Sequence, residues 1–164
     1  MDFSLKAGWK KEINDVTNDF SYFKSALTFN HSLNQTGSIT WATKVSIHHN
    51  FTNFEFFQGA TIGGKDGLRG FRNERFNGKT AFYHSNDLRF HFSKYYNRIV
   101  PFDYGMYLSF DYGKVWIDSE VSSLLHTSYG TGVWLRAFEA VVINAGIHFS
   151  DEKSRVIAGI GFEF

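Results

Sequence analysis

The chain has 164 residues, enough for one domain, with a formal net charge of +1, no cysteine and one proline. The near-zero charge gives no overall attraction to nucleic acid or acidic partners, and the lack of cysteine excludes disulfides and thiolate-bound metal. Aromatic residues make up 19% of the chain, although the mean hydropathy is only −0.27. This combination indicates strands with one apolar face, and no apolar run approaches the ~20 residues that a membrane helix needs.

Alternation of apolar and polar residues runs along most of the chain and predicts eight antiparallel strands. The stretch SITWATKVSIHHNF, which begins at Ser38, keeps a period of two for about fourteen residues, whereas an average strand has ~5–6. Short turns are predicted near 34–37, 95–100 and 138–139, and a long loop at 52–79. The predicted strands cover residues 2–13, 20–33, 38–51, 80–94, 101–116, 126–137, 140–150 and 154–164.

The segment 101–116 shows how the two faces of a predicted strand differ. Its even positions from Phe102 to Tyr112 are apolar or aromatic, whereas most of its odd positions are aspartate, glycine or serine, among them Asp111 and Gly113. Side chains at alternate positions point to opposite faces of a strand, so each strand has one apolar and one polar face. The apolar faces of the strands should include Val45, Leu108, Ile143 and Ile160.

Two all-β architectures have such alternation: a soluble β-sandwich and a transmembrane antiparallel β-barrel. Soluble strands are usually shorter than these, and the single proline is typical of long uninterrupted strands. A membrane barrel also has aromatic girdles, and aromatic residues gather near the strand ends on the short-turn side: Tyr95, Tyr96, Phe102, Tyr104, Phe138 and Phe164. We therefore predict one membrane-barrel domain over residues 1–164, with the β-sandwich as the alternative.

The long connection contains TIGGKDGLRGFRNERFNGKT, in which the alternation stops and glycines and arginines take over. This segment resembles the sixth-extracellular-loop motif of the BamA/TamA/FhaC superfamily of outer-membrane barrels, where a glycine pair and an RG(F/Y) box precede an RF-x-G segment. The segments NDLRF, LSFDYGKVW and YGTGVWLR resemble further motifs of that superfamily in the same order. The matching loop residues are Gly63, Gly64, Leu68, Arg69, Gly70, Phe71, Arg75, Phe76 and Gly78.

The resemblance implies an internal latch, in which Arg69 reaches into the barrel and pairs with acidic residues of the wall. Asp87 and Asp111 lie at the matching positions, and Gly113 leaves room for a close approach of the loop. The C-terminal GIGFEF, with Phe162 and Phe164, is similar to the recognition signal of bacterial outer-membrane proteins. The resemblance thus implies an outer-membrane location with periplasmic termini.

An enzyme is not expected. His48 and His49 are adjacent on a predicted strand and face opposite ways, so they cannot share a metal ion, and no other histidines have ligand spacing. The segment GGKDG lacks the GK(S/T) of a phosphate-binding loop, and Asp66 and Glu74 interrupt the basic charges of the long loop. We expect no catalytic residues, no metal, no cofactor and no nucleic-acid partner.

The function that the resemblance implies is insertion or translocation of proteins at the outer membrane, with a passive pore or a membrane anchor or exporter for a separate partner as the alternative. The expected partners are the lipid bilayer, including lipopolysaccharide, and protein clients. Superfamily barrels usually have 16 strands and often periplasmic POTRA domains, whereas eight strands are predicted here. The chain is therefore expected to form either half of a 16-stranded barrel, completed by a second copy or by an N-terminal half-barrel, or a small closed barrel.

Overall fold

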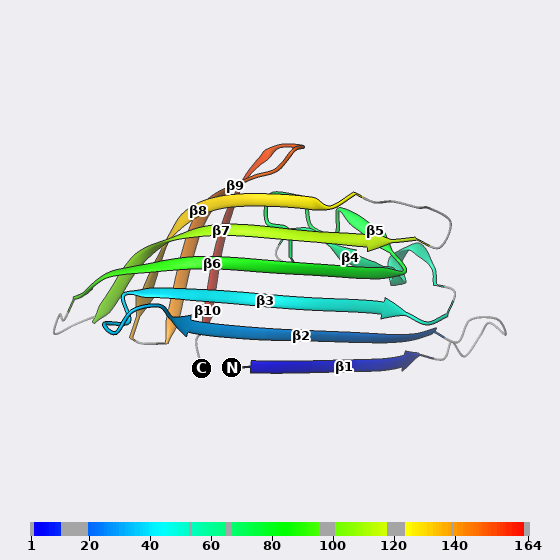
Figure 1. Cartoon of the computed structure of the whole chain (residues 1–164), viewed down its shortest axis with the longest axis horizontal. Helices are drawn as coiled ribbons and strands as arrows, with labels where there is room; N and C mark the ends of the chain where they lie inside the picture. The colour runs from blue at the N-terminus through cyan, green and yellow to red at the C-terminus, as the bar shows by residue number, and fades with distance from the viewer. Residues whose placement is uncertain are drawn as a thin grey trace.

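The computed structural model describes residues 2–10, 20–52, 54–64, 67–95, 101–117, 124–138 and 140–162. Eight long strands form one antiparallel sheet in the order β1-β2-β3-β6-β7-β8-β9-β10, and each strand pairs with the next long strand along the chain (Figure 1). The prediction of an all-β antiparallel fold is confirmed. The strands are β1 (Asp2–Lys10), β2 (Phe20–Ser32), β3 (Ile39–Asn50), β6 (Thr80–Tyr95), β7 (Phe102–Trp116), β8 (His126–Ala137), β9 (Val141–Phe149) and β10 (Ser154–Phe162).

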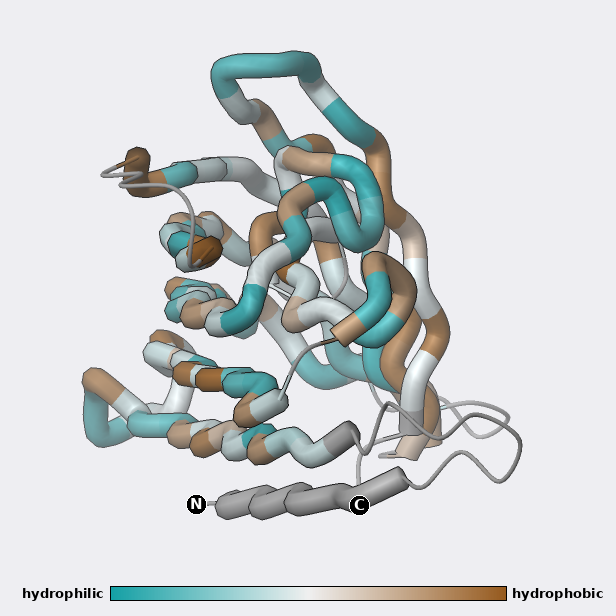
Figure 2. The backbone as a smooth tube through the Cα atoms, turned by 90° about the vertical axis from the view of Figure 1, so that its right-hand side faces the viewer, coloured by the Kyte–Doolittle hydropathy of each residue, from teal (hydrophilic) through white to brown (hydrophobic). Residues whose placement is uncertain are grey.

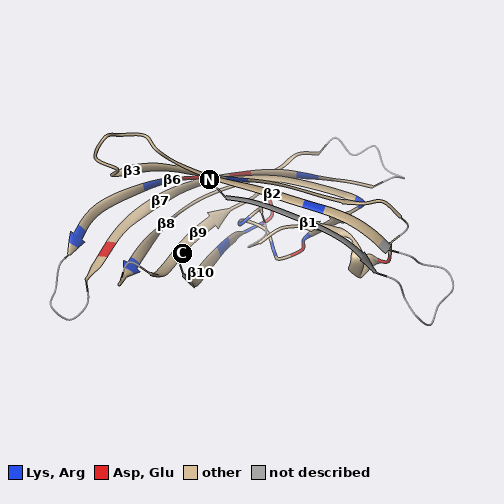
Figure 3. Ribbon diagram, turned by 90° about the horizontal axis from the view of Figure 1, so that it is seen from below, with Lys and Arg blue, Asp and Glu red and all other residues tan. Residues whose placement is uncertain are grey.

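The sheet bends into an arch, and its later strands turn away from the plane of the first three (Figures 1 and 3). The first and last strands are its edges, because β1 pairs with β2 alone and β10 with β9 alone among the described residues. The sheet is therefore open, and the small closed barrel, one of the two predicted closures, is not found. Bending an eight-stranded sheet into a closed ring also leaves an interior filled by its own side chains, whereas this concave side holds a whole loop.

The exposed and buried positions on the two faces of the sheet are the reverse of those in a soluble protein. The convex face exposes large apolar side chains, among them Leu108 (46% exposed) and Ile160 (74% exposed). On the concave face the polar side chains of Asp103, Asp111 and His148 are buried. The cross-strand register is consistent with this division, since directly paired residues share a face.

The long connection between β3 and β6 lies on the concave side, in the hollow of the arch (Figure 2). It contains a short 3-10 helix, η1 (Phe56–Gln58), and two strands, β4 (Ala60–Ile62) and β5 (Phe76–Gly78), which pair with each other in an antiparallel ribbon. The sequence predicts only a long loop over 52–79, because three-residue strands are too short to show a period. No helix among the described residues has the length and hydropathy that a membrane crossing needs.

A buried apolar cluster lies between this ribbon and the wall formed by β6 and β7. Its members come from both partners, namely Ala60, Ile62, Leu68 and Phe71 from the loop and Ala81 and Tyr83 from β6, with Phe76 and Val115 packed against them. The two parts therefore bury their apolar surface against each other, inside the concavity. This cluster places the loop motif directly beside the acidic residues of the wall.

Candidate functional site

The segment Leu68–Phe71 forms a turn that is pressed against the concave face of the sheet. Leu68 and Phe71 are buried on either side of Arg69, and the Phe71 backbone N–H donates to the Leu68 carbonyl at 3.1 Å. The Ser85 hydroxyl on β6 donates to the Gly67 carbonyl at 2.8 Å, which fixes the start of the turn. With its two apolar neighbours buried, Arg69 is directed at the wall.

Arg69 is held by Asp111 of β7 through both carboxylate oxygens. Its Nη2 donates to Oδ1 at 2.7 Å and its Nε to Oδ2 at 3.0 Å, and its backbone N–H also donates to Oδ2 at 3.2 Å. The Ser128 hydroxyl of β8 donates to the same Oδ2 at 3.2 Å. Asp111 is fully buried, so this two-point, charge-assisted contact is shielded from water.

Asp87 of β6 lies on the other side of the guanidinium. Its Oδ1 is 2.7 Å from Arg69 Nη2, an ion pair whose angle is not that of a directed hydrogen bond. Its Oδ2 also lies 3.4 Å from Nη2 of Arg89 on the same strand. The structure therefore brings Arg69 together with both predicted acidic residues, and Asp111 makes the closer and more extensive contact.

The environment keeps Arg69 charged. Burial alone lowers the pKa of the guanidinium, but the hydrogen bonds and negative charge of Asp111, together with the charge of Asp87, outweigh it and raise that pKa above its ordinary value. The guanidinium also lies 6.0 Å from the ring centroid of Tyr107 on β7. Arg69 is thus a charged anchor for the loop.

Aromatic side chains hold the second half of the loop. Phe71 and Phe76 pack edge to face, with ring centroids 5.0 Å apart. Phe76 stacks on His126 at the start of β8 at 3.6 Å between ring centroids. The loop is therefore fixed at two points, by charge at Arg69 and by aromatic packing at Phe76.

Two of the predicted glycines permit close backbone approach. A Cβ on Gly70 would lie 2.6 Å from the carbonyl oxygen of Phe149 and 2.8 Å from the Ser128 Cβ. A Cβ on Gly113 would lie 2.7 Å from the carbonyl oxygen of Phe82 and 3.1 Å from Cδ1 of Ile62 on β4. Gly113 thus lies beneath the ribbon, where a larger residue would push it away from the wall.

The remaining predicted residues lie around these contacts. Gly63 and Gly64 form the turn after β4, and Gly78 ends β5 against the backbone of Trp116. Phe162 is the last residue of β10, and Phe164 lies outside the described residues. Tyr96, one of the aromatic residues predicted near the strand ends, also lies outside the described residues.

Sequence reasoning missed the contacts between the loop and the hairpin of β9 and β10. Arg75 pairs with Glu152 at 2.7 Å, the Ser150 hydroxyl donates to the Gly70 carbonyl at 3.0 Å, and the Arg155 guanidinium donates to the Phe71 carbonyl. Two of these three contacts end on backbone carbonyls, which leave no trace in side-chain identity. The charge of Arg75 and Glu152 was the only available signal.

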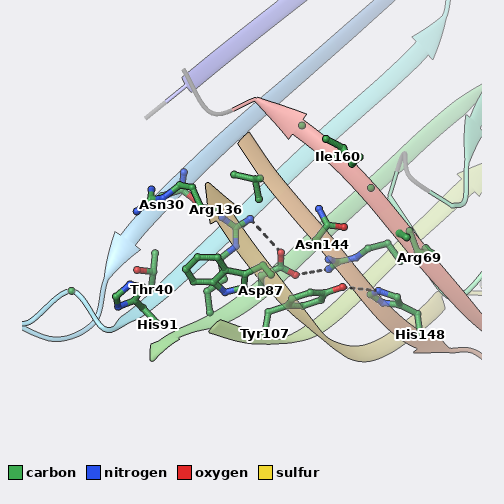
Figure 4. Close-up of a pocket in the computed structure, with 18 residues that line it drawn as sticks. Asn30, Thr40, Arg69, Asp87, His91, Tyr107, Arg136, Asn144, His148 and Ile160 are labelled. Atoms are coloured by element: carbon green, nitrogen blue, oxygen red, sulfur yellow. Dashed lines mark hydrogen bonds and ion pairs between the residues drawn. The ribbon is translucent and has the colours of Figure 1, made fainter. Parts of the chain in front are cut away.

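A cavity of about 580 Å³ lies next to Arg69 on the concave face, and strands from opposite ends of the sheet line it (Figure 4). Arg136 of β8 holds the buried Asp103 with Nη2 at 2.6 Å and Nε at 3.1 Å. The Tyr107 hydroxyl lies 3.4 Å from Nε2 of His148. Three arginines, Arg69, Arg89 and Arg136, thus line the cavity together with apolar side chains such as Trp134 and Val142.

No group of histidine, aspartate and glutamate side chains suited to a metal ion is found among the described residues. The carboxylates of the site, Asp87, Asp103 and Asp111, are all engaged by arginine or hydroxyl donors. What the arrangement can do chemically is to fix a loop inside a curved sheet.

Comparison with curated proteins and with solved structures gave no match. The family model described as haemolysin secretion/activation protein ShlB/FhaC/HecB matches residues 4–135. The matched region includes the loop and its partners Asp87 and Asp111, and it ends before β9. This family consists of outer-membrane proteins that act in protein secretion. Since the match covers well over half of the residues of this chain, the chain belongs to the ShlB/FhaC/HecB family.

Proposed function

We propose that this chain forms wall strands of a transmembrane β-barrel in the bacterial outer membrane and acts, without enzymatic activity, in the translocation or insertion of proteins at that membrane. Segment 52–79 is the internal latch loop of this barrel, anchored by Arg69. The termini face the periplasm. The observation that carries the proposal is the bidentate contact of Arg69 with the buried Asp111, inside a sheet whose convex face is apolar.

The exposed apolar face supports a lipid environment. Soluble monomers rarely expose contiguous apolar patches above a few hundred Å², whereas here large side chains are exposed along successive strands. Aromatic contacts also mark the strand ends on the short-turn side. The ring centroids of Tyr95 and Phe102 lie 5.4 Å apart, and those of Phe102 and Tyr104 lie 6.3 Å apart. Such girdles are typical of outer-membrane barrels at the level of the lipid headgroups, including those of lipopolysaccharide.

The open edges support an incomplete barrel. An unpaired strand edge cannot face lipid, so β1 and β10 require partner strands in a bilayer. An even number of antiparallel strands makes β1 and β10 run in opposite directions, and both have nine residues. We propose that a second copy supplies the other half, with β1 of each copy paired to β10 of its partner; an N-terminal half-barrel is the other possible source.

The experiment compares cells that lack this protein with cells that carry the wild-type or the Arg69→Ala form. Proteomics of the cell surface and medium should show that one or a few secreted proteins are lost in cells without this protein and reduced in cells with the Arg69→Ala form. An unchanged secreted proteome would contradict the translocation role. If, in that case, Arg69→Ala raises the ion conductance of the purified protein in planar bilayers, the passive pore replaces translocation as the function.

A further inference from the structure

The hairpin of β9 and β10 contacts the latch loop at three points close to its turn. Ser150 donates to the Gly70 carbonyl at 3.0 Å, and Nε of Arg75 donates to Glu152 Oε1 at 2.7 Å. The third contact is the donation from the Arg155 guanidinium to the Phe71 carbonyl. All three loop residues lie within the segment 70–75, directly after Arg69, so the anchor and the hairpin contacts act on the same short piece of chain.

The position of Arg155 follows from the register of the sheet. Arg155 is paired with His148, which is buried on the concave face, and directly paired residues in antiparallel strands point to the same side. The side chain of Arg155 therefore extends into the concavity, toward the loop. Because Gly70 has no side chain, the loop lies directly on the backbone of Phe149, which brings the Phe71 carbonyl within reach of Arg155.

Strand β10 is the edge of the sheet. Among the described residues its backbone pairs with β9 alone, and the contacts from Arg155 and from the turn are its additional link to the rest of the molecule. A hairpin at a sheet edge opens more easily than a central strand, because only one side of it is hydrogen-bonded. The loop contacts therefore bear on the part of the sheet that is otherwise the least restrained.

We infer that Arg155, supported by Ser150 and Glu152, is a positioning residue that couples the latch loop to the edge strand β10. When the loop is docked, the hairpin is held against it; when the loop leaves, the edge strand is released. This inference rests on the proposed function, in which the loop is an internal latch and β10 is a seam of the barrel.

The two attachments of the loop differ in strength. Arg69 is paired with a fully buried carboxylate at two points. Arg75 and Glu152 are 47% and 35% exposed, and exposed ion pairs contribute little stability. Arg69 is therefore the stronger attachment of the loop, and the hold on the hairpin depends on the loop staying docked there.

Hydrogen–deuterium exchange of the purified full chain in detergent tests the coupling, with heat-dependent gel mobility as the check that each variant is folded. Arg155→Ala should raise exchange about fivefold or more in the β10 amides that pair with β9, since it removes a hydrogen bond from a charged donor. Exchange in β6 and β7 should not change. Arg155→Lys should restore part of the protection, because an ammonium group also donates to a carbonyl.

Lys153→Ala is the matched control, since it removes one positive charge from the same hairpin. The Lys153 side chain makes no hydrogen bond or ion pair in the described part of the chain, so its loss should leave exchange in β10 as in the wild type. As a second test, Glu152→Arg should raise exchange in the hairpin, and Arg75→Glu together with Glu152→Arg should lower it again.

A double-mutant cycle separates this inference from the latch itself. In a background of Arg69→Ala, where the loop has already left the wall, adding Arg155→Ala should change exchange in β10 less than twofold. Additive effects, or no effect of Arg155→Ala in the wild-type background, overturn the coupling. If Arg69→Ala leaves the loop protected, the latch of the proposed function fails instead; if it frees the loop and not β10, only the coupling fails.

Discussion

Asp111 on β7 accepts hydrogen bonds from the guanidinium of Arg69 with both carboxylate oxygens, at 2.7 and 3.0 Å, although the two residues are 42 positions apart in the chain. Asp111 is completely buried, and Ser128 and the Arg69 backbone also donate to it. Removing Arg69 would leave the negative charge of Asp111 in a place that water does not reach. This contact is therefore the point at which the loop is most sensitive to mutation.

Substitution of the anchor should release the loop. Arg69→Ala leaves Asp111 buried and unpaired, which costs roughly 3–5 kcal/mol of folding free energy. We expect a lower temperature for the heat-dependent mobility shift on gels and new protease cleavage within 67–79. Arg72→Ala, at an exposed arginine of the same loop, is the control. Melting and cleavage like those of the wild type in Arg69→Ala would show that the pair does not hold the loop.

The two acidic partners should differ in importance. Asp111→Asn should destabilise the protein by about 3 kcal/mol, because a neutral amide accepts with one oxygen only and leaves the partly buried guanidinium of Arg69 without its main counter-charge. Asp87→Asn should cost about 1 kcal/mol, since Asp87 is partly exposed and is shared with Arg89. Denaturant melts of both variants measure the difference. Equal losses would mean that Asp87 carries as much of the contact as Asp111.

A methyl group at Gly70 should displace the turn. Gly70→Ala places a Cβ 2.6 Å from the Phe149 carbonyl oxygen, so the loop or β9 must shift, at a cost of about 1–3 kcal/mol. Gly161→Ala is the control, because a Cβ at Gly161 meets no atom within 4 Å. Denaturant melts should show a loss only for Gly70→Ala. If both variants keep wild-type stability, the loop does not lie on β9 in solution.

Two neighbouring positions of β9 test which face meets lipid. Ile143 is exposed on the convex face, whereas Asn144 lines the cavity of the concave face. Ile143→Arg should destabilise the protein by about 2–4 kcal/mol in a bilayer, and Asn144→Arg by much less. Unfolding in liposomes gives these values, and spin labels at the same positions should report lipid and water respectively. The opposite pattern would mean that the concave face, and not the convex face, meets lipid.

Cysteines on the two edges test how the barrel closes. The chain has no native cysteine, so Leu5→Cys with Ile160→Cys introduces the only thiols. Cross-linking in membranes should give a species of doubled mass, since the edges are proposed to pair between two copies. A bond formed solely within one chain would contradict the two-copy barrel. A lack of cross-linking in folded protein would point to a separate half-barrel.

The strands could be predicted because a period of two persists over nine to sixteen residues in each of them. The ribbon of β4 and β5 could not, since each of these strands has only three residues, too few to show a period. Arg69 is one arginine among several in its loop, and only the resemblance of the motif singled it out. The links from Ser150 and Arg155 were unpredictable because they join residues 80 or more positions apart and end on backbone carbonyls.

The apolar cluster described above lies between the loop and the concave wall, and both sides come from the same chain. The wall can pair its strands without the loop, whereas the loop finds its partners only on an existing wall: Asp111 on β7, His126 on β8 and Gly113 beneath β4. Assembly therefore has a fixed order, in which strand pairing comes first and entry of the loop comes last. In the proposed barrel this final step takes place inside the concavity, away from the lipid that meets the convex face.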